Sequence, residues 1–259
     1  MGQALEELNL RVAEFRNDLS FLEYAFELRP RINQALDFEK RGPVLELARK
    51  FGAVVGSQPA TVYGPMLVRL VASLERYLRF LIRDTIEAWN SRAKTFDQLP
   101  EGLSGRNLVL SGRVIASSDS PREHVNIDLV ELVERLATCR SGATNFRLNA
   151  SAFMIQVVGV TPDIIENGLK LARITNWRDA VAADKDLQRQ LNCTRTSDAT
   201  KKAEARLKEL SRWRNNWAHG GDDEVSLTLA ELEEAVEFVS LFSRALDRVV
   251  TKQVAAKRL

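Results

Sequence analysis

The sequence predicts an all-α protein, a helical bundle that carries an N-terminal helical extension. The 259-residue chain has only 7 prolines and 13 glycines, which favours long helices over a turn-rich β-sandwich. Hydrophobic residues make up 45% of the chain, enough for a substantial core. This length suits one large domain, or one domain with an extension. We place the extension at residues 1–60 and the main helical domain at residues 61–259.

The extension is expected to begin with a long amphipathic helix. Apolar residues over 3–28 recur mostly at three- and four-residue steps, and the pattern breaks near Pro30. A short second helix is expected over 43–56, where a proline stands at the first turn. The stretch 56–65 is interpreted as a linker, and the boundary between the extension and the domain lies there.

The helix expected over 66–94 has the strongest pattern in the chain. Its apolar positions wrap around most of the circumference, which predicts a place at the centre of the core. The following stretch, 97–126, is polar, and 107–117 within it is a candidate for a short strand. Four arginines of the 66–94 helix share part of one flank, interpreted as a solvated face: Arg69, Arg76, Arg79 and Arg83.

Shorter helices are expected over 126–139, 149–160 and 161–174. The third of these has Thr161 as its candidate cap and Pro162 at its first turn.

Two longer helices are expected to complete the domain. The helix over 196–221 has Ser197 or Asp198 as a candidate cap and Gly220 as a stop. The last helix is expected over 227–250. Its start carries a capping-box pair and a hydrophobic-staple pair: Thr228 with Glu231, and Leu227 with Leu232.

Charge and composition exclude several classes of protein. The net charge is +2, so any attraction for nucleic acid must come from a local basic surface. The two cysteines, Cys139 and Cys193, lie far apart without a pairing motif, which fits a reducing cytoplasm. The N-terminus carries charges throughout, unlike a signal peptide, and no apolar run approaches the roughly 20 residues that cross a bilayer. We therefore expect a cytoplasmic protein without a membrane partner.

No familiar cofactor or metal motif is present. The sequence has no nucleophile elbow and no phosphate-binding glycine loop. His124, His219 and two scattered cysteines do not form a recognisable zinc site, and no spaced acidic set resembles a metal-dependent nuclease. We therefore expect chemistry without a metal or a cofactor. His124 lies in a polar stretch and is interpreted as a surface or capping histidine.

The run RNNWAHG, residues 214–220, carries the chemistry that the rest of the chain lacks. Arg214 and His219 are five residues apart, so on a helix they diverge by about 140° and by about 7.5 Å along the axis. Asn215 and His219 share a face, so the amide can orient the imidazole. The helix C-terminus favours imidazolium, a proton donor, and the Arg214 fork fits phosphate oxygens.

These are the parts of a metal-free RNA cleavage site: a base, an acid and a cation for the charged transition state. Trp213 and Trp217 share another face and are expected in the core. The competing interpretation is a capped helix end with an exposed arginine and no catalytic role.

The run resembles the Arg-x4–6-His motif of the HEPN superfamily of small all-α ribonucleases found in toxin–antitoxin, abortive-infection and other defence systems. The order of helices resembles the RiboL-PSP-HEPN branch, in which an early long helix carries a glutamate. The resemblance assigns catalytic roles to Arg214, Asn215 and His219. It also implies that Glu75 occupies the position of the glutamate on the early long helix of that branch. We add Asn216 as a supporting residue.

The resemblance also implies a homodimer in which two motif helices line one composite cleft. That arrangement lets the arginine of one chain serve the histidine of the other. Members paired with nucleotidyltransferase antitoxins often have a tyrosine two residues after the histidine, whereas this chain has Gly221, so control by adenylylation is doubtful. Exposed loop arginines, Arg106 and Arg113, are candidates to follow the RNA backbone.

The resulting hypothesis is a metal-independent HEPN endoribonuclease, a toxin or anti-phage effector with RNA as substrate and an antitoxin or regulatory protein as partner. The alternative is a HEPN module that binds RNA or protein without cutting. A third hypothesis is a helical scaffold in which the motif is a coincidence.

Overall fold

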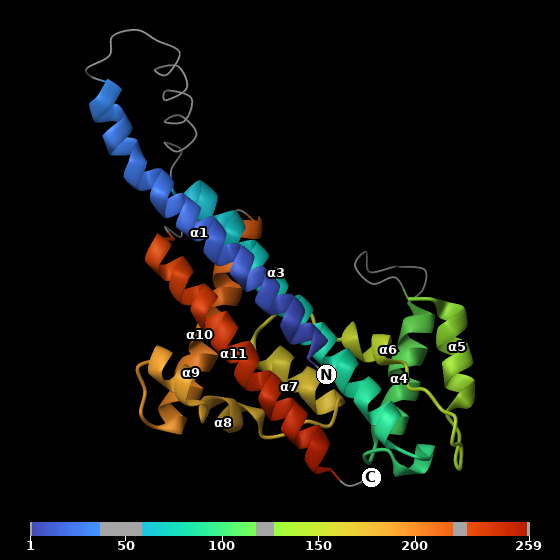
Figure 1. Ribbon diagram of the computed structural model, residues 1–259. Coiled ribbons are helices and arrows are strands. Elements are labelled where there is room, and N and C mark those ends of the chain that lie inside the picture. The colour runs from blue at the N-terminus through green and yellow to red at the C-terminus, as the bar shows by residue number, and fades with distance from the viewer. Residues whose placement is uncertain (1, 37–58, 118–126, 220–226, 258–259) are drawn as a thin grey trace.

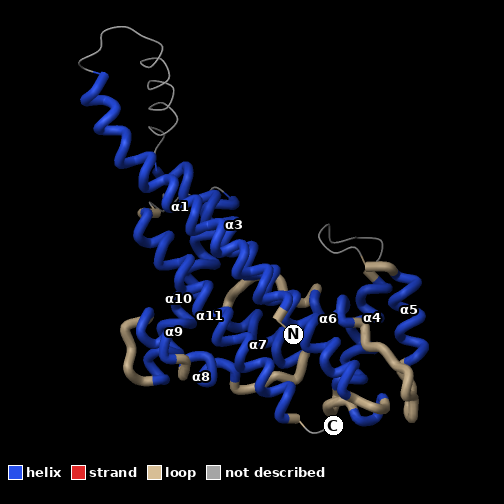
Figure 2. The backbone as a smooth tube through the Cα atoms, viewed as in Figure 1, coloured by secondary structure: helices blue, strands red, loops and turns tan. Residues whose placement is uncertain are grey.

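The computed structural model describes residues 2–36, 59–117, 127–219 and 227–257. Within these ranges it gives ten α-helices and one short 3-10 helix, Phe96–Gln98, with no strand (Figure 2). The prediction of an all-α fold is confirmed. The short helix expected over 43–56 lies outside the described residues, as does His124.

The longest elements are α1, Gln3–Leu36, and α3, Pro59–Arg92, which run side by side in opposite directions (Figure 1). Two ion pairs join the helices in this antiparallel arrangement, Arg76 to Glu7 at 3.0 Å and Arg69 to Asp18 at 4.0 Å.

Two predicted helix boundaries in this region were wrong, the end of α1 and the start of α3, and a proline lies at or near each. Helix α1 continues through Pro30 to Leu36, and α3 begins at Pro59, inside the expected linker. A proline near a helix start costs little because its missing N–H lies among the first four N–H groups, which have no partner in the helix. Six residues further on, Pro65 is also tolerated inside α3.

Helix α3 lies at the centre of the core, as its pattern predicts. Leu67, Leu70 and Ile86 are fully buried, and at about 100° per residue their side chains span nearly half of the helix circumference. The other long helices, α10 (Thr196–His219) and α11 (Leu229–Ala256), both pack against it. Two buried polar groups of α3 have partners outside the helix, since the Tyr77 hydroxyl donates to the Ser243 carbonyl at 2.9 Å and Trp89 Nε1 donates to the Ala172 carbonyl at 2.9 Å.

The four arginines of α3 are not a free solvated flank. Arg69 and Arg76 hold α1, as above, and their guanidinium groups lie over the rings of Phe15 and Phe80. The other two pair within α3, Arg79 with Glu75 and Arg83 with Asp84.

The extension shares the core of the rest of the chain. Helix α1 packs against both α3 and α11. Its inward side chains form one stripe that is continuous with the main core: Ala4, Leu8, Val12, Phe15 and Leu19.

The expected strand within 107–117 is wrong, because this stretch belongs to helix α4, Leu103–Ala116. Apolar residues alternate with polar ones over only a few positions there, so the pattern did not distinguish a strand from a helix. The inward face of α4 is unusual in being partly polar, with Asn107 and Ser111 both buried. The outward face carries exposed apolar residues: Leu108, Val109 and Ile115.

Asn149 satisfies these buried polar groups and joins three helices. Its backbone N–H donates to Asn107 Oδ1 at 2.8 Å. Its side-chain amide donates to Ser111 Oγ at 2.9 Å and to the Leu132 carbonyl at 3.1 Å. This residue is the N-cap of α6, Ala150–Met154, and Leu132 lies in α5, Leu129–Thr138. One side chain therefore links α4, α5 and α6.

Three short helices follow α6. Helix α7, Pro162–Leu171, has Thr161 at its N-cap position and Pro162 at its first turn, as expected, although the Thr161 side chain makes no capping hydrogen bond. Helices α8, Trp177–Ala182, and α9, Lys185–Gln190, were not predicted. Each has only six residues, too few to show a helical period.

The two C-terminal helices have the predicted form with one difference. Helix α10 begins at Thr196, so Ser197 and Asp198 lie in its first turn and are not caps. Its last residue is His219, next to the expected stop at Gly220, which lies outside the described residues. The capping box at the start of α11 is confirmed, with Thr228 Oγ1 accepting from the Glu231 N–H at 3.2 Å.

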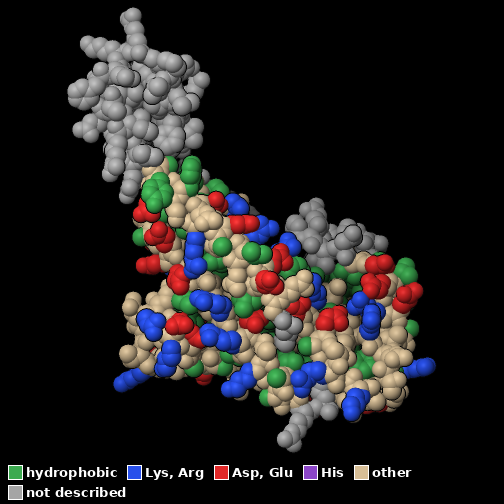
Figure 3. Space-filling view, in the orientation of Figure 1, with side chains coloured by type: hydrophobic (Ala, Val, Ile, Leu, Met, Phe, Trp, Pro, Cys, Tyr) green, Lys and Arg blue, Asp and Glu red, His purple; other side chains and the backbone are tan. Residues whose placement is uncertain are grey.

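The visible surface is mixed in charge. Figure 3 shows Lys and Arg side chains interspersed with Asp and Glu, in keeping with the small net charge. In the part of the chain that the structure describes, no helix is long and apolar enough to span a bilayer.

Asn149→Ala should lower the free energy of unfolding by about 1–3 kcal/mol, because it leaves buried polar partners on α4 and α5 without a donor. Asn167→Ala, at an exposed position of α7, is the matched control and should change it by less than about 0.5 kcal/mol. Chemical denaturation of both variants measures the difference. Equal stabilities would show that the three-helix link does not stabilise the fold.

Candidate functional site

The motif occupies the last two turns of α10, where the helix crosses the start of α3. Trp213 is buried with 5% of its surface exposed, and Trp217 is half-buried against the core. Both tryptophans thus face the protein interior as the sequence pattern predicts. They continue an inward stripe made by earlier residues of α10: Ala199, Ala203, Leu207 and Leu210.

The tightest contact at this crossing is between Trp217 and Gly64. A Cβ atom placed on Gly64 would lie 2.2 Å from Cδ2 of the Trp217 ring, so only glycine allows the indole to approach the α3 backbone this closely. The indole Nε1 is buried without a described acceptor. Gly64 was not predicted as a site residue because it lies in the stretch 56–65, which was interpreted as a linker.

Tyr63 lies next to this contact and is also buried. Burial, together with the nearby Glu233 carboxylate, raises the pKa of its phenol. Tyr63 therefore remains neutral across the physiological range and contributes no charge beside the motif.

Arg214 is half-buried, and its Nη1 donates to Oδ1 of the neighbouring Asn215 at 3.0 Å. Among the described residues, no carboxylate lies within ion-pair distance of Arg214. Its remaining N–H groups are thus available to a phosphate, which suits the bidentate geometry of guanidinium. The structure places the Asn215 amide on Arg214, whereas helix spacing alone suggested His219 as its partner.

His219 is the terminal residue of α10, and its side chain lies outside the described part of the chain. Its backbone position fits a place at the negative end of the helix dipole. Asn216 is half-buried beside the motif.

The other proposed site residues lie apart from the motif. Glu75 follows Gly64 by eleven residues, about 16 Å along the α3 axis. Its carboxylate pairs with Arg79, whose Nε donates to the Val157 carbonyl at 2.9 Å. In this structure Glu75 therefore stabilises the contact between α3 and the segment that precedes α7.

Arg106 and Arg113 are helical residues, not loop residues. Both lie in α4, seven residues apart, and so share one face of that helix. Figure 1 shows α4 and α10 on opposite sides of α3. The structure does not bring these two arginines together with Arg214.

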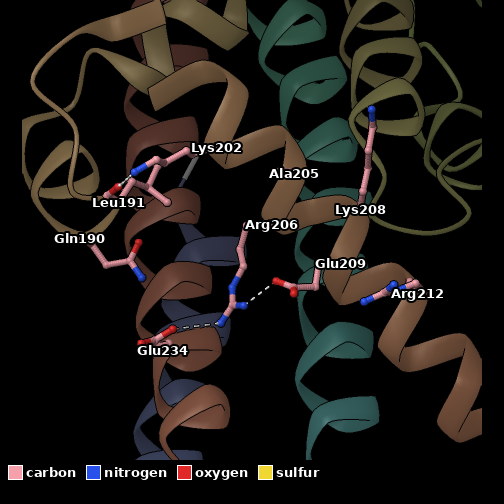
Figure 4. Close-up of a pocket in the computed structure, with 9 residues that line it drawn as sticks. All are labelled: Gln190, Leu191, Lys202, Ala205, Arg206, Lys208, Glu209, Arg212 and Glu234. Carbon is pink, nitrogen blue, oxygen red and sulfur yellow. Dashed lines mark hydrogen bonds and ion pairs between the residues drawn. The ribbon is translucent and has the colours of Figure 1, made fainter. Parts of the chain in front are cut away.

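A hollow of about 610 Å³ lies along α10 before the motif, between this helix and the neighbouring ends of α9 and α11. Arg206 crosses it, pairing with Glu209 at 2.6 Å and with Glu234 at 3.7 Å (Figure 4). The same guanidinium lies 5.1 Å from the centre of the Trp213 ring. Arg206 thus fixes α10 against α11 just ahead of the motif.

No group of three or more His, Cys, Asp or Glu side chains in the described ranges is arranged to hold a metal ion.

Comparison with known proteins identifies a family. The chain matches the family model described as RiboL-PSP-HEPN over residues 56–252, which is more than two thirds of its length. Comparisons with curated proteins and with solved structures gave no match. The matched range includes α3, the motif end of α10 and most of α11, and it excludes α1.

The Trp217–Gly64 contact can be tested with two glycines that both lie inside helices. Gly64→Ala should lower the free energy of unfolding by about 1–3 kcal/mol, because the overpacking penalty exceeds the gain in helix propensity. Gly112→Ala in α4 is the control, since its Cβ meets no atom within 4 Å, and it should be neutral or stabilising. A stabilised Gly64→Ala protein would contradict the close packing of the motif helix on α3.

Proposed function

The chain belongs to the RiboL-PSP-HEPN family, and from this premise we propose that it is a metal-independent endoribonuclease whose site is completed by a second copy of the chain. The observation that carries the proposal is Arg214: a half-buried arginine, oriented by Asn215, with no described carboxylate to neutralise it. An arginine in this state is suited to bind phosphate and stabilise charge that develops on it.

The proposed reaction is an attack of the RNA 2′-hydroxyl oxygen on the adjacent phosphorus. The new bond joins O2′ to phosphorus, and the bond from phosphorus to O5′ breaks. A base takes the 2′-hydroxyl proton, and an acid gives a proton to the leaving O5′. The products are a 2′,3′-cyclic phosphate, which water opens to a 3′-phosphate, and a 5′-hydroxyl end.

We assign the proton transfers to His219 and the stabilisation of the phosphorane-like transition state to Arg214. Asn215 positions the guanidinium through the 3.0 Å hydrogen bond. Helix geometry supports a site made by two chains, because the two side chains of one helix diverge by about 140°. In a homodimer, each Arg214 serves the His219 of its partner.

The proposed biological role is that of a toxin or an anti-phage defence effector, held in check by an antitoxin or regulatory protein. Family membership supports this role, and cleavage of cellular RNA is its biochemical requirement.

Purified protein should cleave total RNA in excess EDTA. Arg214→Ala should lower the cleavage rate by about 10²–10³-fold and His219→Ala by about 10²–10⁴-fold. Both variants should keep the wild-type melting temperature within a few degrees. Arg140→Ala, at an exposed position away from the motif, is the control and should cleave like the wild type.

A strict need for Mg²⁺ or Mn²⁺ would contradict the metal-independent mechanism. RNA that binds in a gel-shift assay but is never cut would favour the alternative, a non-catalytic binding module. A His219→Ala protein that unfolds as readily as Trp217→Ala would identify the histidine as a structural cap.

The two-chain site can be tested by mixing inactive subunits. Arg214→Ala and His219→Ala chains, unfolded and refolded together, should recover part of the cleavage activity, because a mixed dimer contains one intact Arg–His pair. Each variant refolded alone is the control. Absence of activity in a confirmed mixed dimer would contradict a composite site in which one pair suffices.

A further inference from the structure

The solvent-facing side of α10 carries a line of basic residues that leads to the motif. Lys201, Lys208 and Arg212 are all exposed. At about 100° per residue, the three side chains leave the helix within about 20° of one common direction. His219 follows Lys201 by eighteen residues, which is five full turns at about 3.6 residues per turn. The backbone position of His219 is therefore on the same side of the helix as that of Lys201.

These three cations have no described partner. Among the described residues, no carboxylate forms an ion pair with Lys201, Lys208 or Arg212. Two of the three acids of α10 are engaged elsewhere, since Glu204 pairs with Arg178 at 2.9 Å and Glu209 pairs with Arg206 at 2.6 Å. The third, Asp198, lies at the start of the helix, before the line begins.

The carboxylates that line the hollow beside this row of cations are paired with another residue. Figure 4 shows the Glu209 and Glu234 carboxylates turned to Arg206, with ion pairs to both. Lys202, on the far rim, donates to the carbonyl of Leu191 at 2.9 Å. The acidic groups of the hollow thus pair with Arg206 and one lysine bonds to the backbone, and no carboxylate in the described ranges pairs with Lys208 or Arg212 at its edge.

The basic series on α3 provides a contrast within the same molecule. Arg69, Arg76, Arg79 and Arg83 each have a carboxylate partner. Their charges serve the packing of α1 and the internal order of α3. The α10 series has similar helical spacing without carboxylate partners among the described residues, so its charge is available to a ligand.

We propose that Lys201, Lys208 and Arg212 form a binding track for the backbone of single-stranded RNA, which leads the strand along α10 to His219. A line of unpaired cations on a helix suits a linear polyanion, because each can contact a successive phosphate while the bases remain free. Lys208 and Arg212 are about 6 Å apart along the axis, and Arg212 is about 10.5 Å from His219. The track rests on the proposed ribonuclease function and specifies its substrate as a single strand extending beyond the cleavage site.

The track predicts a particular kinetic signature. Its cations contact phosphates away from the reacting bond, so they contribute equally to the ground state and the transition state. Their loss should raise KM and leave kcat unchanged. Each lost phosphate contact on a single strand should also reduce the slope of log K against log salt concentration by about 0.7.

The test uses the full-length chain with Lys201→Gln, Lys208→Gln and Arg212→Gln combined, and a labelled single-stranded RNA. Glutamine keeps helix propensity close to that of Lys and Arg. The control combines Lys94→Gln, Arg140→Gln and Lys252→Gln, which removes the same charge from exposed positions outside α10. Cleavage gives KM and kcat, and a gel-shift titration over a range of salt gives the slope.

The track variant should show at least a roughly tenfold rise in KM, an unchanged kcat and a salt slope smaller by about 2. The control should match the wild type. A track variant that behaves like the control overturns the track while leaving the ribonuclease intact. A fall in kcat without a change in KM also overturns it. A wild type that neither cuts nor binds RNA overturns the proposed function, and the track with it.

Discussion

The packing of α10 against α3 is the constraint on which the rest of the site depends. Trp217 rests on the bare backbone of Gly64, so the last turn of the motif helix sits at a distance that the α3 main chain sets. Further back, Arg206 fixes the same helix against α11. Because α10 is held at both points, each outward position has a defined direction. Arg214 and the basic residues of α10 are therefore oriented by the packing of the helix on α3 and α11.

Helix α10 carries arginines of two kinds: one whose charge is paired within the protein and one whose charge is available to a ligand. Arg206 is held by two carboxylates, the Glu231 carbonyl and the Trp213 ring. Among the described residues, the partner of the Arg214 guanidinium is the neutral amide of Asn215. A guanidinium that already pairs with carboxylates has little to gain from a phosphate, since binding would first break those pairs. An arginine with one neutral partner keeps its charge for a ligand. This difference in partners, more than exposure, is the reason for the proposed role of Arg214 in binding phosphate.

Much of the fold could be predicted from periodicity, and the failures have local causes. The 66–94 pattern located α3, and the Thr228–Glu231 pair located the start of α11. The error at 107–117 arose because α4 buries Asn107 and Ser111, so its inward face does not look apolar. The end of α1 was misplaced because Pro30 was interpreted as the end of the helix, whereas α1 continues to Leu36.

In the candidate site, too, the features that could be predicted depend on residues close in sequence, and those that could not depend on residues far apart. The motif located Arg214, and helix spacing placed Trp213 and Trp217 in the core, because both depend only on residues close in sequence. The contact between Trp217 and Gly64 joins residues far apart in sequence, so no local sequence pattern predicts it. Glu75 was carried over by resemblance, and its ion pair with Arg79 is a local pair four residues apart within α3. The hydrogen bond from Arg79 to the Val157 carbonyl joins residues far apart in sequence, so the α3 sequence alone does not predict it.

The extension has a structural consequence for the site. Helix α1 lies outside the range that matches the family, yet its apolar stripe belongs to the central core and its acids pair with Arg69 and Arg76. By covering α3 and α11, α1 gives the outer side of α3 a partner within the same chain. The motif end of α10 packs on α3 through Trp217, and its outward face carries the unpaired cations. With α3 enclosed between α1 and the other long helices, that outward face of α10 carries positive charge that no described carboxylate compensates. Such a face attracts a polyanion and repels a second copy of itself, so the charge of this face favours contact with a nucleic-acid backbone over direct packing against its own counterpart.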